Sequence, residues 1–473
     1  MKPLTLQEIR RTVGGRSTQA LPAVGPSISA ICTDTRHMQP NSLFIALCGE
    51  NFDGHRFLQD AAAGGAIAAV VSSVPENAPP SLQLIIVPDT RIALGKLGAL
   101  VRKGLRCKVI AVAGSNGKTS TKRLIDAVLA TKLKGSYSPK SFNNDIGVPL
   151  AIFAAESAHD YLILEIGTNH PGEISNLTKI AQPDIAVLTN CSAEHLEFLG
   201  DIAGVRRENA CIIEALNHRG LLIVNADDPL LLDAVADYPG NKVTFGFGSH
   251  NDLFPTDLHA DETGVQFMMN GRVPISVPLL GKHTAVNALA AIAVGMRLRI
   301  SEADIVAGLS VAKGPEMRLQ LDRVGDITLL NDAYNANPAS MKAALETLQS
   351  LPTQGRRIAV LGDMRELGVT SDQLHEEVGE FAARCNLDEL VCIGNLGRLI
   401  AETARKVGMA EDRVRLFPDA DSAALHMPRG ITGGDVVLLK ASRGIGLEVL
   451  AKAIKENRSK KKEAHAEPQS RKV

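Results

Sequence analysis

The chain has 473 residues, which at about 150 residues per domain corresponds to roughly three domains. Its hydrophobic fraction of 45% and charged fraction of 22% are close to the averages of soluble globular proteins, so a disordered or fibrous chain is excluded. Lysine and arginine number 51 against 52 aspartates and glutamates, and aromatic residues make up 3% of the chain, with no tryptophan. Because positive charge is not in excess and aromatic rings are few, we expect no nucleic-acid partner and no membrane partner.

The seven cysteines are scattered along the chain, and no two of them form a Cys-x-x-Cys pair. This pattern argues against a disulfide framework and against a zinc site. The first residues alternate polar and apolar side chains, unlike a signal peptide, and no segment reaches the roughly 18 apolar residues of a membrane span. The sequence therefore predicts a reduced, cytoplasmic, soluble protein.

Two short apolar runs near the N-terminus indicate strands of a small α/β domain. They occupy residues 66–71 and 82–87, and a proline-containing turn separates them. From residue 90 onward the apolar residues follow a helical period, which leads into another apolar run at 109–113. We therefore place the first domain boundary near Pro88 and assign residues 1–88 to an N-terminal domain.

Buried-strand patterns then recur, with helical segments between them. Runs that are apolar on both faces and separated by helices indicate parallel sheets. The first three such runs, at 161–166, 184–188 and 221–224, indicate a central domain over residues 89–314. The next three, at 357–361, 389–393 and 436–439, indicate a C-terminal domain over residues 315–473. The predicted fold class is α/β with three domains.

The C-terminal end is basic from about residue 457, with lysines at 460–462 and further basic residues at 471–472. We interpret this tail as a frayed, solvated end. Nothing in the sequence indicates an obligate protein partner, so a monomer is expected.

The strand at 109–113 runs directly into a glycine-containing loop and then a helical segment. Backbone N–H groups and the helix dipole at such a turn face an anion, so the loop is predicted to bind phosphate. Lys118 adds a charge for the β- and γ-phosphates, and the Thr119 hydroxyl is placed to ligate magnesium. The standard pattern has a glycine where this chain has Val112, and a purely local turn is the alternative. The loop comprises Gly114, Ser115, Asn116, Gly117, Lys118, Thr119 and Ser120.

ATP with Mg²⁺ is therefore the expected ligand. The central domain is predicted to be a P-loop parallel-sheet ATPase domain. It is flanked by a small N-terminal α/β domain and a C-terminal Rossmann-like α/β domain.

Two further polar residues follow neighbouring strands of the central domain. Glu165 ends the strand at 161–166, where it can reach a magnesium ion held by Thr119. A solvated strand-end carboxylate is the alternative for Glu165. His195 follows the strand at 184–188, on the same sheet edge, although an isolated histidine is usually structural.

A series of motifs in fixed order resembles the Mur ligases, ATP-dependent amide-forming enzymes of peptidoglycan synthesis. The similarity runs from about residue 31 to residue 448, and a series of this length is far more specific than any single motif. The motifs lie at 33–36, 51–55, 114–120, 143–149, 165–174, 195–197, 281–283 with Asn287, Arg318, 332–338, 362–368 and 440–443.

Two of these motifs favour one branch of the family. The Tyr-Asn-Ala-Asn-Pro motif at 334–338 and the Gly-Asp-Met-x-Glu-Leu-Gly motif at 362–368 resemble the members that add D-Ala-D-Ala to UDP-N-acetylmuramoyl-tripeptide. The Asp-Asn-Pro-Arg motif expected of the diaminopimelate-adding relative does not occur. The resemblance implies that ATP phosphorylates the substrate carboxylate and that the amine of D-Ala-D-Ala then attacks the acyl phosphate. Whether the third peptide residue is diaminopimelate or lysine stays open.

Two alternatives remain beside this function. One is another amide ligase of the same superfamily, such as a folylpolyglutamate synthase. The other is a nucleotide-binding scaffold that has lost ligation.

The resemblance also implies roles for individual residues. In catalysis it implies Lys118, Glu165 and His195, with Thr119 and Glu165 at a first magnesium ion and His195 at a second. Beyond the loop, it implies ATP contacts by His283, Asn287, Arg318 and Asp332. Arg318 and Asp332 are expected to approach ATP only when the domains close.

The remaining implied residues concern the peptide substrates. In the N-terminal domain, Thr35 and Arg36 correspond to contacts with the UDP-sugar, where a basic side chain suits a diphosphate. The others implied are Asn143, Asn144, Tyr334, Asn335 and Asn337. For Asn143 and Asn144 a turn-forming role is the alternative, and the same holds for the asparagines after Tyr334. The Asp-Gly-His segment at 53–55 is either a ligand contact or a simple turn.

Two positions depart from the family pattern. Many relatives carry a carbamylated lysine where this chain has Asn209, and Thr284 stands where the family often has asparagine. An asparagine is short and neutral, whereas the carbamate supplies an anionic oxygen on a long arm. We therefore expect a second magnesium ion to bind more weakly, through water, or through a replacement ligand.

Overall fold

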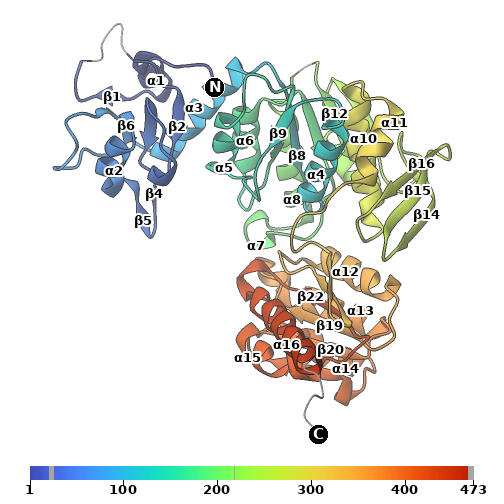
Figure 1. Ribbon diagram of the computed structural model, residues 1–473. Helices are drawn as coiled ribbons and strands as arrows, with labels where there is room; N and C mark the ends of the chain where they lie inside the picture. The colour runs from blue at the N-terminus through green and yellow to red at the C-terminus, as the bar shows by residue number, and fades with distance from the viewer. Residues whose placement is uncertain (21–25, 218, 467–473) are drawn as a thin grey trace.

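The computed structural model describes residues 1–20, 26–217 and 219–466, with side chains up to residue 459. It consists of three lobes: the N-terminal lobe lies beside the central lobe, and the C-terminal lobe lies below the central lobe in the view of Figure 1. Each lobe contains a mainly parallel sheet with helices packed against it, which confirms the predicted α/β class.

The N-terminal lobe holds a five-stranded sheet in the order β1-β7-β6-β3-β2. Its strands are β1 (Arg16–Ser17), β2 (Ala30–Cys32), β3 (Ser42–Ile45), β6 (Ala66–Val71) and β7 (Gln83–Ile86), and only β1 pairs antiparallel. The strands predicted at 66–71 and 82–87 are thus confirmed as β6 and β7. The other elements of this lobe are α1 (Leu6–Val13), α2 (Leu58–Ala63), β4 (Cys48–Gly49) and β5 (Phe52–Asp53).

Helix α3 (Thr90–Gly104) connects the N-terminal and central lobes (Figure 1). The Asp89 carboxylate accepts hydrogen bonds from two backbone N–H groups of its first turn, which is why the helix begins there. Its apolar face, including Leu94, Leu97 and Val101, belongs to a core that reaches from the N-terminal sheet to the central sheet. The lobes are therefore joined by packing as well as by the chain.

The central lobe holds a parallel six-stranded sheet in the order β13-β12-β11-β8-β10-β9. The predicted strands correspond to β8 (Lys108–Ala113), β10 (Tyr161–Glu165), β11 (Ile185–Leu188) and β12 (Leu221–Asn225), and β9 (Gly135–Tyr137) and β13 (Asn241–Phe245) complete the sheet. One face is covered by α4 (Lys118–Leu129), α10 (His283–Arg297) and α11 (Glu302–Ser310). The opposite face is covered by α3, α5 (Gly147–Phe153) and α6 (Glu173–Ala181). Three short helices follow, α7 (Leu196–Leu199), α8 (Ile202–Ala210) and α9 (Pro229–Ala234).

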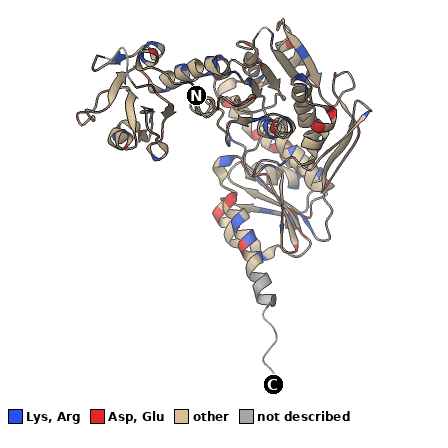
Figure 2. Ribbon diagram, turned by 45° about the horizontal axis from the view of Figure 1, so that its top comes forward, with Lys and Arg blue, Asp and Glu red and all other residues tan. Residues whose placement is uncertain are grey.

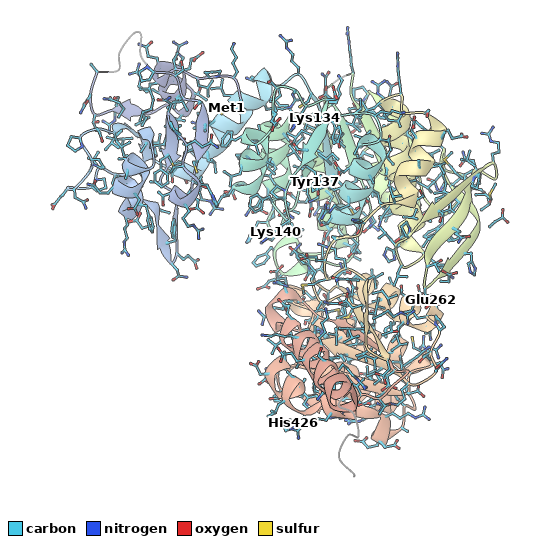
Figure 3. The ribbon with its side chains drawn as sticks, viewed as in Figure 1. Met1, Lys134, Tyr137, Lys140, Glu262 and His426 are labelled. Carbon is cyan, nitrogen blue, oxygen red and sulfur yellow. The ribbon has the colours of Figure 1, made fainter. Side chains whose placement is uncertain are left out.

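A three-stranded antiparallel sheet extends the central lobe and was not predicted. It comprises β14 (Pro255–Asp261), β15 (Gly264–Met269) and β16 (Val273–Val277). Its buried side chains, such as Val265 and Phe267, alternate with more exposed ones, so no continuous apolar run marks these strands. Figure 3 shows Glu262, at the turn of the β14–β15 hairpin, beside the C-terminal lobe, where it accepts a hydrogen bond from Arg323.

The C-terminal lobe holds a six-stranded sheet in the order β17-β18-β22-β19-β20-β21, with β17 antiparallel at its edge. Its predicted strands are confirmed as β19 (Arg357–Gly362), β20 (Glu389–Ile393) and β22 (Val436–Lys440), beside β17 (Gln320–Val324), β18 (Ile327–Asn331) and β21 (Val414–Phe417). The helices that pack on it are α12 (Pro338–Ser350), α13 (Ser371–Arg384), α14 (Gly397–Lys406), α15 (Ala420–His426) and α16 (Glu448–Ala466).

The predicted frayed tail from residue 457 is wrong over its first part, because α16 continues to Ala466. Arg458 anchors this helix: it is 8% exposed, pairs with Asp326 at 3.2 Å and donates to the backbone oxygen of Ile431 at 2.6 Å. Figure 2 shows basic and acidic residues together on α16. The basic residues at 471–472 lie outside the described residues, as do the side chains at 460–462. No helix in the described part of the chain is long and apolar enough to cross a membrane.

Candidate active site

The phosphate loop lies between a buried strand and a helix. Residues 109–113 of β8 are fully buried, and α4 begins at Lys118 directly after the loop. Val112 belongs to the buried strand, so the loop starts only at Gly114 and is shorter than the standard pattern. The unbonded N–H groups and the dipole at the start of α4 face the loop, which suits an anion.

Both loop glycines are required by their conformation and by close neighbours. Gly114 has φ of +124° and Gly117 has φ of +82°, a region that other residues rarely adopt. A Cβ atom at Gly114 would lie 2.2 Å from Thr189 Oγ1, and one at Gly117 would lie 2.6 Å from Asn287 Oδ1. The loop therefore has no room for side chains at these two positions.

Replacing Gly117 with alanine is expected to weaken ATP binding by about tenfold, since the left-handed conformation alone costs roughly 1–2 kcal/mol for such a residue. Calorimetric titration with a non-hydrolysable ATP analogue measures this effect. Gly104→Ala is the matched control, because its φ is not positive and an added Cβ meets no atom within 4 Å. Equal nucleotide affinity of both variants would contradict the expectation.

Lys118 is held within the loop. Its Nζ donates hydrogen bonds to the backbone oxygens of Gly114 and of Ser115, the latter at 3.1 Å. The ammonium group thus lies where phosphate oxygens would approach the loop.

The Glu165 carboxylate lies beside the first turn of α4. Thr119 Oγ1 is 3.1 and 3.0 Å from its two oxygens, and Asn143 Nδ2 is 3.4 Å from Oε1. Hydroxyl and carboxylate oxygens are the ligands that Mg²⁺ prefers, so Thr119 and Glu165 form a donor set that fits this ion.

Lys122 is a site residue that sequence reasoning missed. Its side chain is 1% exposed, and Nζ donates to Glu165 Oε2 at 2.9 Å and to the backbone oxygens of Ser138 and Lys140 at 2.9 and 2.8 Å. Burial lowers the pKa of Lys122, and the Glu165 carboxylate partly offsets this shift. The signal in the sequence was its position one helical turn after Lys118, on the face of α4 turned to the sheet.

The segment that follows β11 forms hydrogen bonds with the phosphate loop. Asn190 Oδ1 accepts from the Asn116 N–H at 3.0 Å, and Asn190 Nδ2 donates to the Asn116 oxygen at 2.9 Å. Ser192 N–H donates to Ser115 Oγ at 2.9 Å. The segment that leads to His195 is therefore bonded directly to the loop.

His195 joins the central lobe to the C-terminal lobe. Its Nδ1 is hydrogen-bonded to Glu366 Oε2, and the backbone oxygen of Glu366 accepts from the Glu197 N–H at 3.1 Å. Glu366 follows β19 in the motif at 362–368, and no role had been expected for it.

Asn209 lies apart from these residues. It is 1% exposed in α8, and its Nδ2 donates to the Val205 oxygen of the same helix at 3.0 Å. Its side chain does not line the cavity described below. Asn144 likewise has a local role, since its Oδ1 accepts from the Gly147 N–H at 2.8 Å at the start of α5.

Residues at the start of α10 form the wall next to Gly117. Asn287 is buried against the loop, and His283 lies one turn earlier on the helix. The Thr284 hydroxyl donates to the Leu280 oxygen at 2.8 Å, so it is engaged within its own helix end.

The C-terminal lobe brings a second group of predicted residues to the loop. The Arg318 guanidinium stacks over the Tyr334 ring at 4.3 Å, and the Tyr334 hydroxyl is hydrogen-bonded to Ser141 of the central lobe. Asn337 caps α12 and donates to Asn116 Oδ1 of the phosphate loop at 2.9 Å. Figure 3 shows the segment from Tyr137 to Lys140 leading from the central lobe toward this junction.

Asp332 is held by a lysine that sequence reasoning left without a role. Lys440 Nζ, 2% exposed as a residue, contacts Asp332 Oδ2 at 2.6 Å and donates to the Asn335 oxygen at 3.1 Å. Asp332 Oδ1 accepts from the Leu319 N–H at 3.0 Å. The carboxylate is therefore fixed in orientation next to Arg318.

A cavity of about 1020 Å³ lies between the central and C-terminal lobes, and most of the predicted site residues line it. The predicted residues that are not part of its wall are Gly114, Thr119, Thr35, Arg36 and Asn209. The predicted residues that line it are Ser115, Asn116, Gly117, Lys118, Ser120, Asn143, Asn144, Glu165, His195, His283, Asn287, Arg318, Asp332, Tyr334, Asn335 and Asn337.

Thr35 and Arg36 lie in a short 3-10 turn of the N-terminal lobe, away from that cavity. The Arg36 guanidinium, 82% exposed, pairs with Asp34 at 2.6 Å and holds the pKa of that carboxyl at about 2. In the motif at 51–55, His55 Nε2 accepts from the Ser72 N–H at 3.0 Å and Nδ1 contacts Asp53 at 2.7 Å. Both nitrogens of His55 are thus engaged, which supports the simple turn.

Each of the three lobes matches a known family model. The family models for the Mur ligase family catalytic domain, the Mur ligase middle domain and the Mur ligase glutamate ligase domain match residues 27–102, 112–295 and 317–443. The UDP-N-acetylmuramoyl-tripeptide--D-alanyl-D-alanine ligase of Bacillus subtilis (strain 168) is 38% identical over 432 residues, covering 91% of this chain and 94% of that protein. The chain belongs to the Mur ligase family. As a Mur ligase it is an ATP-dependent enzyme that forms amide bonds.

Solved structures of Mur ligases share its arrangement. A crystal structure of MurF from Acinetobacter baumannii superimposes with a TM-score of 0.85 at 30% identity, covering 96% of this chain and 99% of that one. MurF ligase from Thermotoga maritima, in complex with ADP, gives a TM-score of 0.80 at 26% identity, covering 91% and 98%. The three-lobed architecture is therefore that of these Mur ligases.

Proposed function

We propose that this Mur ligase joins D-Ala-D-Ala to UDP-N-acetylmuramoyl-tripeptide, with ATP converted to ADP and phosphate. The observation that carries the proposal is the 38% identity to a ligase of that name across 91% of the chain, including the C-terminal lobe that completes the cavity. A folylpolyglutamate synthase structure is 19% identical and so shares the fold alone.

The central lobe is proposed to bind the nucleotide. The phosphate loop binds the ATP phosphates, and Lys118 stabilises the charge that develops as the γ-phosphate is transferred to a carboxylate. Thr119 and Glu165 are the residues that would hold Mg²⁺, which supplies further charge neutralisation. His283 and Asn287 at the start of α10 are proposed to contact the adenine.

The C-terminal lobe supplies the residues that enclose the reacting groups. Arg318 and Asp332 face the cavity from this lobe, and Asn337 contacts the phosphate loop directly. Bringing these side chains against the loop excludes water, which would otherwise hydrolyse an acyl phosphate. Asn143, Tyr334 and Asn335 line the same cavity and are proposed to contact the substrates joined there.

The N-terminal lobe is proposed to bind the UDP part of the substrate through Thr35 and Arg36. The Arg36–Asp34 pair is exposed, so exchanging that partner for a diphosphate costs little. Asn144 is less suited to a substrate role because its side-chain oxygen already caps α5.

Phosphate release from ATP tests the proposed function. With UDP-N-acetylmuramoyl-tripeptide present, release is expected to depend on added D-Ala-D-Ala and to yield one amide product per phosphate. Release that is indifferent to D-Ala-D-Ala, or that requires a different acyl substrate, would assign another reaction. Nucleotide binding without release under every substrate combination would support the scaffold alternative.

A further inference from the structure

Glu194 is a buried carboxylate that faces the inter-lobe cavity. Its side chain is 9% exposed, and the residue lines the cavity next to His195. Within the described part of the chain, no group donates a hydrogen bond to its oxygens, and its one ion-pair contact is His195 Nε2, 3.9 Å from Oε2. Buried carboxylates are normally hydrogen-bonded, paired or bound to a metal. This carboxylate is therefore placed to be stabilised by a bound cation.

The neighbouring imidazole is oriented in the way that metal-binding histidines are. His195 Nδ1 is occupied by Glu366 Oε2, so Nε2 is the nitrogen that faces Glu194. A carboxylate on one ring nitrogen commonly fixes the other nitrogen toward a metal ion. Both His195 and Glu366 have positive φ, +51° and +63°, a conformation that occurs preferentially at functional sites in residues other than glycine.

Glu194 and His195 also lie close to the phosphate loop. Ser192, two residues before Glu194, donates its N–H to Ser115 Oγ at 2.9 Å. The Ser192 hydroxyl accepts from Asn116 Nδ2 at 2.8 Å. An ion held by Glu194 and His195 would thus be close to the phosphates of a bound nucleotide.

The position expected to supply a negative ligand to a second ion cannot do so. Asn209 is neutral, and its amide is bonded to Val205 within α8 rather than exposed in the cavity. Any anionic side chain that binds a second ion must therefore come from another position in the chain.

We propose that Glu194 and His195 bind a second divalent cation, with Glu194 supplying the charge that family resemblance assigns to a carbamylated lysine. Two ligand bonds of about 2.1 Å can span the 3.9 Å between the two atoms. One or two carboxylates with phosphate oxygens and water are the usual ligands of Mg²⁺. This inference rests on the proposed use of ATP but not on the identity of the peptide substrate.

Manganese binding tests the site with the full chain. Mn²⁺ is titrated into the enzyme with one equivalent of a methylene-bridged ATP analogue, and free Mn²⁺ is followed by electron paramagnetic resonance. We expect two Mn²⁺ ions per chain in the parent enzyme. In Glu194→Gln the second ion is expected to bind at least about tenfold more weakly, because even the loss of a side chain that only orients a metal ligand typically costs roughly 10–100-fold in metal affinity.

The matched control is Glu197→Gln, three residues away, whose exposed side chain makes no interaction within the described residues. It is expected to keep both ions. Because Glu194→Gln removes a buried charge without a hydrogen-bond donor, its metal-free melting temperature is expected to equal or exceed that of the parent. A single Mn²⁺ site in the parent, equal loss in both variants, or unfolding of Glu194→Gln would each overturn the inference. No peptide substrate is present, so failure of D-Ala-D-Ala ligation is a separate result.

Discussion

Replacing Lys118 with methionine is expected to lower kcat by on the order of 10²–10³-fold. The ammonium group lies in the phosphate loop, bonded to the oxygens of Gly114 and Ser115. Transfer of a phosphoryl group to a carboxylate brings like charges together, so removing this positive charge raises the barrier to transfer. Methionine keeps a similar length and apolar stem, so the loop is expected to keep its shape.

Steady-state phosphate release with saturating substrates measures this loss. Lys132→Met, just after the end of α4, is the control, because Lys132 is 58% exposed and, among the described residues, its side chain pairs only with Asp304 at the surface, at 3.3 Å. A Lys118→Met enzyme that retained more than a tenth of the parent kcat would show that the loop backbone alone carries the charge stabilisation.

Replacing Lys122 with methionine is expected to destabilise the central lobe by about 3–5 kcal/mol. The change leaves Glu165, 1% exposed, without its charged partner, and it removes the donor to the backbone oxygens of Ser138 and Lys140. Breaking a buried pair on one side is costly because the remaining charge stays out of water.

Hydrogen exchange of the slowest amides in β8 and β10 measures this destabilisation within the lobe. The double variant Lys122→Met with Glu165→Met is expected to recover part of the loss, since it removes the uncompensated charge. Full recovery is not expected because the two backbone oxygens remain without their donor. Unchanged exchange in β10 for the single variant would mean that Glu165 needs no partner in the folded state.

Sequence reasoning was most successful where the signal is local. The strand at 109–113, the loop at 114–117 and the start of α4 are contiguous, and their apolar run, glycines and lysine specify the phosphate loop directly. Strands buried on both faces, such as β10 and β11, were also predicted, because the run itself marks them. The antiparallel strands β14 to β16 were not, because their partly exposed residues carry no such run.

The same difference between local and long-range signals applies to the site residues. Family resemblance assigned roles to Glu165, His195 and Asp332. It assigned none to the residues that hold them, Lys122, Glu366 and Lys440, although Glu366 and Lys440 lie within the motifs at 362–368 and 440–443. Those partners lie 43, 171 and 108 residues away in the chain, so no spacing could reveal them.

By itself the sequence determined the fold class, the phosphate loop and the Mur ligase motifs, since each depends on neighbouring residues. Only the tertiary structure decided that Asn337 contacts Asn116, 221 residues earlier, and that Asn209 lies outside the cavity that Glu194 lines. The physical reason is that burial and charge pairing depend on which surfaces meet when the lobes pack. That packing sets the partner of each polar group.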